Sequence, residues 1–372
     1  MDHLVGDLMK RLILSLICLL FLSEKLLAQD NESPHLTPNT FTHTLTSSIV
    51  ANQIYKLSVA LPDSYHSNTN NEYPIIFVLD GQWNFTLVKD ISGKLAYDGM
   101  IPQVITVGIT WGGENDDPSI LRFRDFLRPE IPFLPMSGGA DLFLTALTEE
   151  LVPFVQQNYR TNGKKVLLGT SLGGLFTTFA MVEKKNFFDG YLSIAGSFFA
   201  DGIYIEEKLF QMSRSDELKG VRSFMAVGSL DSNSALVQTM HSAIKEAHLK
   251  GFKHKSKTYK GVGHAGVEPI AYTYGLQYLF QRPQLKLSEE FLQRYIGEYE
   301  GGPEGAEPSP ITVSTGGTGK LIIGNTFQSA EYLAESETRF YINGVNVSVE
   351  FLSENSFILN SQGTTLTFNR IE

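Results

Sequence analysis

The stretch KVLLGTSLGG at residues 165–174 constrains the fold of this chain more than any other. A short apolar run leads into Gly169-x-Ser171-x-Gly173, and the apolar sequence LFTTFAMV follows it. This order predicts a strand, a sharp turn and a helix, with Ser171 at the apex of the turn. Side chains at positions 169 and 173 would collide with neighbouring backbone, so glycine is expected at both. A glycine-rich helix start without chemistry is the alternative interpretation.

The apolar pattern around this motif predicts an α/β fold with a doubly wound, mostly parallel sheet. The run PIIFVLD at 74–80 has the composition of a strand buried on both faces, and residues 140–159 have helical apolar spacing. Strands that alternate with helices are typical of parallel sheets. Further strands are expected at 54–61, 103–110, 165–170, 191–195, 223–228 and, as a more polar edge strand, 252–259, with helices after Ser171, at 234–250 and at 269–280.

The chain changes character after Pro283, where a second, smaller domain is expected. Gly and β-forming residues dominate residues 285–372, in short segments separated by turn residues, after a short helix at 288–295. This pattern favours a small antiparallel sheet or barrel. Residues 42–282 then form the α/β domain, and the polar residues 29–41, which include two prolines, form a flexible lead-in.

Residues 1–28 have the pattern of an export signal. Two basic residues precede an apolar core at 12–22, and Ala28 offers a small residue for cleavage. The core is too short to span a bilayer comfortably, and Met9 is the expected start because acidic residues precede it. The only cysteine, Cys18, lies in the signal, so the mature protein would need no disulfide. We expect a periplasmic or secreted bacterial protein.

Composition excludes several classes of function. The 372 residues carry a net charge of −10 and no basic patch, which argues against a nucleic-acid partner. The eight histidines lack metal-ligand spacing, and His241 and His248 are expected to be surface residues of one helix rather than metal ligands. We therefore expect no metal and no other cofactor.

A serine nucleophile needs a base to take its proton and a carboxylate to orient that base. Of the histidines that follow Ser171 before the domain boundary, His241 and His248 fall in a helical pattern and His254 falls in a strand. His264 lies in a loop just after the last predicted strand, where a base can reach a serine at the carboxyl ends of the strands. His264 is therefore the predicted base, and a loop histidine without a role is the alternative.

The loop that carries His264 also matches Gly-x-Gly-x-x-Gly at residues 261–266, but we reject a dinucleotide site. The preceding strand is polar rather than buried, and no acidic residue follows at the required distance. The motif also falls at the end of the sheet rather than on its first turn.

Asp231 is the predicted acid, because it comes just past a buried strand and lies between Ser171 and His264 in the sequence. It could instead cap the helix that begins near Ser234. The competing carboxylates have other interpretations. They are Asp201 and Glu206 in a lid or helix start, Asp216 and Glu217 in a charged surface turn, and Glu268 at the start of the closing helix.

The oxyanion of an acyl-transfer reaction needs backbone N–H groups aimed at the developing charge. One is expected to be the N–H of Leu172, the residue after the nucleophile. The second is expected from the loop after the strand at 74–80, where Gly81 lets the chain turn close to Ser171. We favour the N–H of Gln82.

Together these residues resemble the putative-esterase family of α/β-hydrolases, which includes enterochelin and salmochelin esterases, S-formylglutathione hydrolases, feruloyl esterases and mycolyltransferases. The resemblance implies Ser171 as nucleophile, His264 as base and Asp231 as acid, although many relatives have Glu at the last position. The form LDGQ, without His-Gly, is nearest the siderophore-esterase branch. The resemblance covers residues 42–281 and rests on GTSLGG at 169–174, YPIIFVLDG at 73–81, VGI at 107–109, RFRDFLRP at 122–129 and EELVPFVQQNYRT at 149–161.

The arginine-rich segment 122–128 is expected to be a loop. Arg122 and Arg124 could meet substrate anions or catecholates there, since guanidinium groups bind such oxygens well. Surface ion pairs with Asp125 and Glu130 are the alternative, and the sequence does not separate the two.

Aromatic residues flank the expected cleft. Trp83, Phe198 and Phe199 could stack on an aromatic acyl group, with core packing as the favoured alternative for each phenylalanine taken singly. Residues 285–372 resemble the small β-domain appended to some exported bacterial hydrolases, and this looser resemblance carries no catalytic residue.

These observations predict an exported serine carboxylic-ester hydrolase that works through an acyl-enzyme. Its substrate would be a small-molecule or glycan-linked ester: a siderophore, a feruloyl or acetyl group on polysaccharide, or a simple short-chain ester. An acyltransferase, a peptidase and a non-catalytic binding protein remain alternatives. The sequence leaves the oligomeric state open.

Overall fold

The computed structural model describes residues 37–371, except residues 115, 135, 304, 306, 362 and 363. The predicted signal at 1–28, with Met9, Cys18 and Ala28, lies outside the described residues, as does most of the predicted lead-in. In the part of the chain that is described, no helix is long and apolar enough to cross a membrane.

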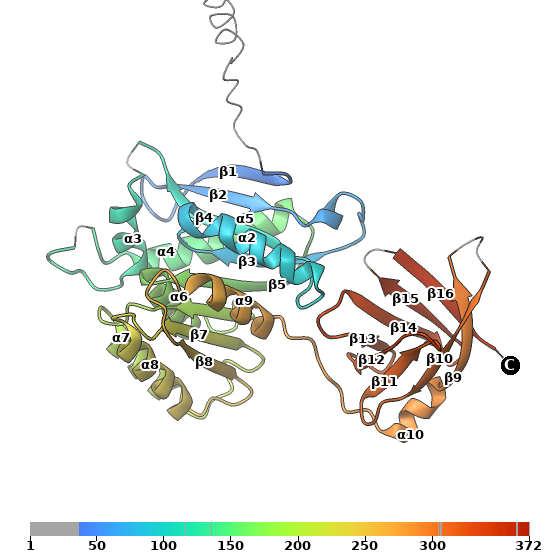
Figure 1. Ribbon diagram of the computed structural model, residues 1–372. Coiled ribbons are helices and arrows are strands. Elements are labelled where there is room, and N and C mark those ends of the chain that lie inside the picture. Colours follow the sequence, from blue (N-terminus) through green and yellow to red (C-terminus); the bar gives the residue numbers. More distant parts are fainter. Residues whose placement is uncertain are drawn as a thin grey trace, which may run out of the picture. The chain divides into compact units, whose positions relative to one another are not determined.

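An eight-stranded sheet forms the centre of the larger domain (Figure 1). Strand β2 pairs in antiparallel fashion with both of its neighbours, β1 and β4, and all the other neighbouring strands pair in parallel. The strand order turns back at β3, so the sheet is doubly wound, as predicted. In spatial order the strands are β1 (Thr40–Thr46), β2 (Ile54–Ala60), β4 (Ile105–Gly112), β3 (Tyr73–Val78), β5 (Thr161–Thr170), β6 (Gly190–Ile194), β7 (Arg222–Gly228) and β8 (Lys253–Tyr259).

Strand β1 was not expected from the sequence. It begins at Thr40, so positions 40 and 41, which we assigned to the lead-in, belong to the sheet. Its sequence TFTHTLT is rich in β-branched threonine but contains no apolar run, because this edge strand is mostly solvent-exposed. Pairing with β2 along all seven residues holds it in place.

Helices cover both faces of the sheet. The crossover from β3 to β4 runs in the opposite direction to that from β5 to β6, so right-handed connections place their helices on opposite faces. On one face α2 packs against α9, and on the other α3, α4 and α6 pack together. The helices are α2 (Gly81–Tyr97), α3 (Pro118–Phe126), α4 (Ala140–Ala146), α5 (Val152–Asn158), α6 (Leu172–Glu183), α7 (Gly202–Gln211), α8 (Ser234–Glu246) and α9 (Glu268–Leu279).

The helix predicted at 140–159 is present but contains a π-helical turn, η3 (Leu147–Leu151), between α4 and α5. Pro153 lies at the start of α5 and has no N–H to donate to the preceding turn. The hydrogen-bonding pattern therefore widens locally before the α-helix resumes.

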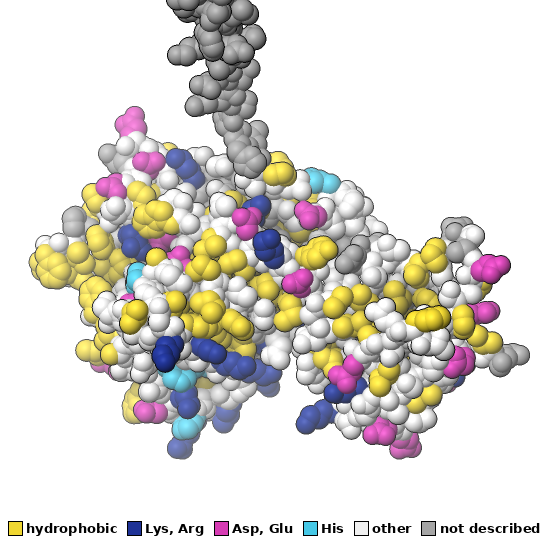
Figure 2. Space-filling view, viewed as in Figure 1, with side chains coloured by type: hydrophobic (Ala, Val, Ile, Leu, Met, Phe, Trp, Pro, Cys, Tyr) yellow, Lys and Arg dark blue, Asp and Glu magenta, His cyan; other side chains and the backbone are white. Residues whose placement is uncertain are grey.

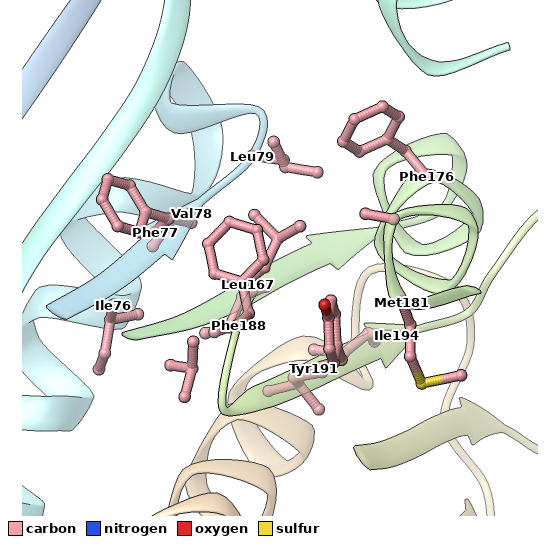
Figure 3. Close-up of a cluster of buried hydrophobic side chains, with 14 of the residues drawn as sticks. Ile76, Phe77, Val78, Leu79, Leu167, Phe176, Met181, Phe188, Tyr191 and Ile194 are labelled. Carbon is pink, nitrogen blue, oxygen red and sulfur yellow. The ribbon is translucent and has the colours of Figure 1, made fainter. Parts of the chain in front are cut away.

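The core of the larger domain lies between the sheet and its helices. Figure 3 shows side chains of β3, β5 and β6 packed with those of α6 and with Phe188. All six residues of β3 are buried, as expected for a strand covered on both faces. This rigid centre holds the carboxyl ends of the parallel strands, where the candidate site lies.

The C-terminal domain is a closed, antiparallel eight-stranded barrel with its own core of Tyr and Phe side chains, such as Tyr299 and Phe357. This confirms the predicted small antiparallel β domain. A short helix, α10 (Glu289–Leu292), and a 3-10 turn, η4 (Gln293–Tyr295), occupy the predicted helix at 288–295. The strands are β9 (Gly297–Gly302), β10 (Ser309–Thr315), β11 (Lys320–Gly324), β12 (Ser329–Ala334), β13 (Arg339–Tyr341), β14 (Val347–Ser353), β15 (Ser356–Ser361) and β16 (Thr364–Arg370).

Candidate active site

Ser171 lies at a sharp turn between β5 and α6. Its φ of 60° and ψ of −119° fall in a region that side-chain-bearing residues rarely occupy. Backbone hydrogen bonds on both sides hold this conformation: the Ser171 N–H donates to Ile194 O at 2.8 Å, and Ser171 O accepts from the Ser197 N–H at 3.0 Å. The surrounding structure thus maintains strain at the serine, a feature that clusters at functional sites.

The glycines next to Ser171 allow the turn to close. A Cβ at Gly169 would lie 2.2 Å from Gly173 O, which confirms the expected collision with backbone. At Gly173 the expectation is wrong, because the atom nearest to a Cβ there is Asp80 Oδ2, a side-chain atom, at 3.2 Å. The second tight backbone contact belongs to Gly174, whose Cβ would lie 2.8 Å from Ile194 O.

Asp231 and His264 lie side by side beyond the carboxyl ends of the neighbouring strands β7 and β8. His264 Nδ1 is 2.8 Å from Asp231 Oδ2. The Asp231 side chain is fully buried, at 0 % exposure, whereas that of His264 is 46 % exposed. A carboxylate in this position fixes the imidazole ring and leaves Nε2 for another partner.

The second oxygen of Asp231 is also used. Its Oδ1 accepts the backbone N–H of Asn233 at 2.8 Å. Asn233 precedes α8, so the Asp231 side chain closes a turn before the helix rather than bonding to the first turn within it. The capping alternative for Asp231 therefore accounts for one of its oxygens, and His264 takes the other.

Ser171 Oγ contacts a residue that the sequence did not single out. It lies 3.1 Å from Ser197 Oγ, and within the described residues it makes no hydrogen bond to His264. Hydrogen bonds between a nucleophile and its base are often long until substrate binds. The structure therefore joins Asp231 and His264 directly and leaves Ser171 at the end of β5 without a direct bond to His264.

Two of the other candidate histidines form a separate pair. The Nε2 atom of His254, in β8, lies 2.9 Å from the Nδ1 atom of His241, in α8, and the two rings share a hydrogen bond. The Nδ1 atom of His254 lies 2.6 Å from Ser223 Oγ. His241 is thus partly buried in a hydrogen-bonded pair, whereas His248 is exposed and lies two residues past the end of α8 rather than on the same helix. Burial lowers the pKa of His254 to about 3. Among the described residues no group of three or more His, Cys, Asp or Glu side chains could hold a metal.

Two competing carboxylates have partners of their own. Asp201 pairs with Arg128, with an Nη2–Oδ1 distance of 2.8 Å. Glu268 is the first residue of α9, and burial raises the pKa of its carboxyl group, while His264 and a hydrogen bond with Thr170 oppose that rise. Glu268 therefore lies within electrostatic reach of His264, but Asp231 is the carboxylate that is hydrogen-bonded to the ring.

The predicted oxyanion donors both lie in first turns of helices. Leu172 begins α6, and Gln82 is the second residue of α2. The N–H groups of a first turn have no carbonyl partner within their helix and point outward. A Cβ at Gly81 would lie 2.8 Å from the backbone of Gly108, so glycine is required there by β4 rather than by Ser171.

Asp80 holds the turn that presents Gln82. It has a left-handed conformation, with a φ of 53°, and its side chain is buried. Arg122 donates to it twice, from Nη2 to Oδ2 at 2.9 Å and from Nε to Oδ1 at 3.3 Å. Burial raises the pKa of the Asp80 carboxyl, and the Arg122 guanidinium opposes that rise.

The arginine-rich segment is mostly helical, and the expectation of a loop is wrong. Arg122 and Arg124 lie in α3, because Asp117 caps this helix and Pro118 starts it. Arg122 pairs with buried Asp80, and Arg124 pairs with buried Asp125 at 2.7 Å. The guanidinium groups therefore have protein partners, and only the pairing of Arg124 with Asp125 had been anticipated.

The three aromatic candidates separate into one core residue and two exposed residues. Phe198 is buried and packs in the core. Trp83 and Phe199 are 57 % and 62 % exposed, and the Arg122 guanidinium lies 5.5 Å from the Trp83 ring centre. Trp83 directly follows Gln82, and Phe199 lies two residues after Ser197. Both rings are thus exposed on residues that follow the carboxyl ends of β3 and β6.

Ser197, Asn233 and Asp80 are the site residues that sequence reasoning missed. Asp80 and Ser197 come within three residues of the carboxyl ends of β3 and β6, where ligands of open α/β sheets bind. That position was the available signal. Asn233 has no comparable signal, because its role depends on contacts across the sheet.

Comparisons with known proteins agree with this fold. The family model described as "Putative esterase" matches residues 47–267. The chain is 26 % identical over 257 residues to the protein named ferri-bacillibactin esterase BesA of Bacillus subtilis, which covers 63 % of this chain and 87 % of that protein.

Solved structures show the same likeness. An IroE-like serine hydrolase from Shewanella oneidensis superposes with a TM-score of 0.58 at 25 % identity, covering 69 % of this chain and 85 % of that one. The BES protein from Bacillus cereus has a TM-score of 0.59 at 23 % identity, covering 68 % and 98 %. Because the family model spans more than half of the 372 residues, the chain belongs to the putative esterase family and is a carboxylic ester hydrolase.

Proposed function

We propose that this protein is a serine esterase in which Ser171, His264 and Asp231 act as nucleophile, base and acid. One observation carries the proposal. A half-exposed His264 is held at 2.8 Å by a fully buried Asp231, beyond the same sheet edge as a serine in strained backbone geometry. A buried carboxylate, an oriented imidazole and a strained serine are the parts that acyl transfer requires.

The reaction follows from these groups. Ser171 Oγ attacks the ester carbonyl carbon as its proton passes to His264 Nε2, and Asp231 stabilises the imidazolium through Nδ1. The N–H groups of Leu172 and Gln82 stabilise the oxyanion of the tetrahedral intermediate. The C–O bond to the leaving alcohol then breaks as His264 returns the proton to that oxygen. Water releases the acyl group by the same steps and restores Ser171.

The substrate class that we propose is a siderophore ester. The relative BesA is named a ferri-bacillibactin esterase, and the IroE-like hydrolase is similar to this chain over the same domain. The exposed Trp83 and Phe199 offer rings on which an aromatic acyl group could stack. Arg122 and Arg128 are already paired with Asp80 and Asp201, so we expect recognition to depend on these rings more than on free guanidinium groups.

An apolar rim extends this surface. Figure 2 shows hydrophobic side chains gathered over the loop between α3 and α4, where Phe133 and Met136 are exposed. Arg128 lies at the start of this loop, just after α3. Its ion pair with Asp201 connects the loop to the segment that follows Phe199. A substrate with aromatic or apolar acyl groups would match such a rim better than a small charged ester.

Export to the periplasm or the medium is part of the proposal. It rests on the apolar sequence of residues 12–22 and on the cleavage position after Ala28. Cell fractionation and N-terminal sequencing of the mature protein test it. A mature chain that begins at Gln29 is expected, and an uncleaved cytoplasmic protein would refute export.

The function is tested by a turnover panel with the purified protein. Ferri-bacillibactin and iron-free bacillibactin are compared with feruloyl and acetyl sugar esters and p-nitrophenyl acetate, with Ser171→Ala as the blank. We expect the siderophores to be cleaved with kcat/KM values orders of magnitude above the others. Turnover of sugar esters or p-nitrophenyl acetate alone would keep the serine mechanism and reject the siderophore substrate.

The same panel separates the other classes of function. Ester products formed with added sugar alcohols would indicate an acyltransferase, and cleavage of matched amides would indicate a peptidase. Full activity of Ser171→Ala would refute the proposed nucleophile. A protein that neither hydrolyses any ester nor reacts with a fluorophosphonate would be a binding protein.

A further inference from the structure

Ser197 lies beside the candidate nucleophile although it is 26 residues away in the chain. It follows β6 through a short turn in which Ala195 has a positive φ of 49°. The Ser197 side chain is buried, and its Oγ lies 3.1 Å from Ser171 Oγ. Two hydroxyl groups at this distance share one hydrogen bond, and either oxygen can be the donor, so the direction has to be inferred from the other partners of Ser197.

Asn233 favours one direction of that bond. Its Nδ2 lies 2.9 Å from Ala195 O, and a backbone carbonyl can only accept, so the atom at this position is the amide nitrogen. The same Nδ2 donates to Ser197 Oγ at 3.2 Å. Ser197 Oγ therefore accepts from Asn233, and within the described residues its only other hydrogen-bond partner is Ser171 Oγ. If Ser197 also accepted from Ser171, the proton of this buried hydroxyl would have no acceptor, which is costly, so we infer that this proton points at Ser171 Oγ.

The consequence reaches the nucleophile. If Ser171 Oγ accepts from Ser197, the proton of Ser171 is not used in that bond and stays free for His264 Nε2. A hydroxyl pair with the opposite direction would occupy the proton that the base must remove. Asn233 also donates its backbone N–H to Asp231 Oδ1 at 2.8 Å, so one residue orders the groups next to both the nucleophile and the base.

We propose that the Ser197 hydroxyl is a catalytic group that donates to Ser171 Oγ, and that Asn233 is a positioning residue that sets this direction. The inference rests on the proposed role of Ser171 and deepens it. The Ser197 bond holds Oγ in place and stabilises the negative charge that develops there as the proton leaves for His264. A misplacement of about 1 Å at a reacting atom costs about a hundredfold in rate.

The test compares Ser197→Ala with Ser193→Ala. Ser193 is also a buried serine near the elbow, but its Oγ donates to Gly174 O and does not touch Ser171. For Ser197→Ala we expect kcat to fall about ten- to a hundredfold with KM unchanged. The rate of labelling by a fluorophosphonate is expected to fall in parallel, whereas Ser193→Ala keeps the wild-type kcat.

Further variants separate a catalytic from a structural role. Ser197→Thr keeps a hydroxyl and is expected to recover most of the activity. Asn233→Ala keeps the backbone N–H to Asp231 and removes no helix cap, because the Asn233 side chain does not cap α8. We expect it to lower kcat about tenfold, with the pKa of the kcat/KM profile unchanged because His264 and Asp231 remain paired. Asn233→Ala also tests the inference if Ser197→Ala does not fold.

The outcomes distinguish this inference from the proposed function. Wild-type kcat in Ser197→Ala, or equal losses in Ser197→Ala and Ser193→Ala, would overturn the role of Ser197 while Ser171→Ala stays inactive. Activity in Ser171→Ala would instead overturn the proposed function. Loss of activity in Ser197→Ala that Ser197→Thr does not recover would show that the hydroxyl is not what matters.

Discussion

Replacement of Arg122 by Gln tests whether this side chain supports the structure or binds substrate. The Asp80 carboxylate is only 1 % exposed, and Arg122 makes two hydrogen bonds to it, at 2.9 and 3.3 Å. Arg122→Gln removes the positive charge and leaves the buried carboxylate without its cation. Because Asp80 precedes the Gln82 N–H by two residues, the same change disturbs a proposed oxyanion donor.

The size of the effect follows from burial. Breaking a buried ion pair by removing one partner costs about 3–5 kcal/mol in the free energy of unfolding. The Arg122 side chain is 18 % exposed, so water relieves part of the loss and we expect a value near the lower end, about 3 kcal/mol. Removing the guanidinium also raises the pKa of Asp80 further, since Arg122 is what opposes the effect of burial.

Urea unfolding with linear extrapolation measures this cost. Lys56→Gln is the matched control, because its ion pair with Asp116, at 3.4 Å, is half exposed and should contribute less than about 1 kcal/mol. Adding Asp80→Asn to Arg122→Gln should recover much of the lost stability, since asparagine is neutral and tolerates the left-handed conformation of position 80.

Activity measurements complete the comparison. We expect Arg122→Gln to lower kcat for neutral and anionic esters alike, because the oxyanion turn is disturbed for both. Unchanged stability together with a KM increase restricted to anionic esters would refute this reasoning. Such a result would return Arg122 to the role of a substrate contact.

Three further predictions follow from single contacts. Asp231→Asn should lower kcat by up to about 10⁴-fold without unfolding the protein, as steady-state kinetics and circular dichroism would show, and a nearly silent change would favour Glu268 as the acid. The pKa of His254 is about 3 in the folded protein and 6.5 in the unfolded chain, so below pH 6.5 only the unfolded state binds the proton. The free energy of unfolding, measured by urea titration, should therefore fall by about 2 kcal/mol between pH 6.5 and pH 5, and it should fall less in His254→Gln. Gly169→Ala should destabilise strongly because its Cβ would lie 2.2 Å from Gly173 O, whereas Gly93→Ala in α2 meets no atom within 4 Å and should stabilise by about 0.5–1 kcal/mol in thermal melts; equal effects would refute the steric argument.

The parallel sheet could be predicted because its signal is local. Runs of buried apolar residues, such as those of β3 and β5, follow directly from the need to cover both faces of a strand. Strand β1 and helices α2 and α3 escaped this argument. The exposed threonines of β1 carry no apolar period, and the start of α3 is marked by the Asp117 cap and Pro118 rather than by an apolar run.

The candidate site could be predicted in part for the same reason. The order of Ser171, Asp231 and His264 along the chain, each just past a predicted strand, indicated that they would meet at one sheet edge. Ser197 could have been proposed on the same ground, since it too follows a buried strand. Its contact with Ser171 could not, because the spacing of neighbouring strands decides it.

Local sequence patterns were enough to predict the strand-turn-helix at Ser171, the alternation of strands and helices, and the change to a β domain after Pro283. These depend on backbone freedom at glycine and on the period of apolar residues, which short segments carry. The polar partners of individual side chains, in contrast, became visible only in the folded protein. The fold placed Arg122 on Asp80, joined His254 to His241, and set Asn233 beside Ser197. Such contacts join residues far apart in the chain, so they exist only once the sheet has brought the strand ends together.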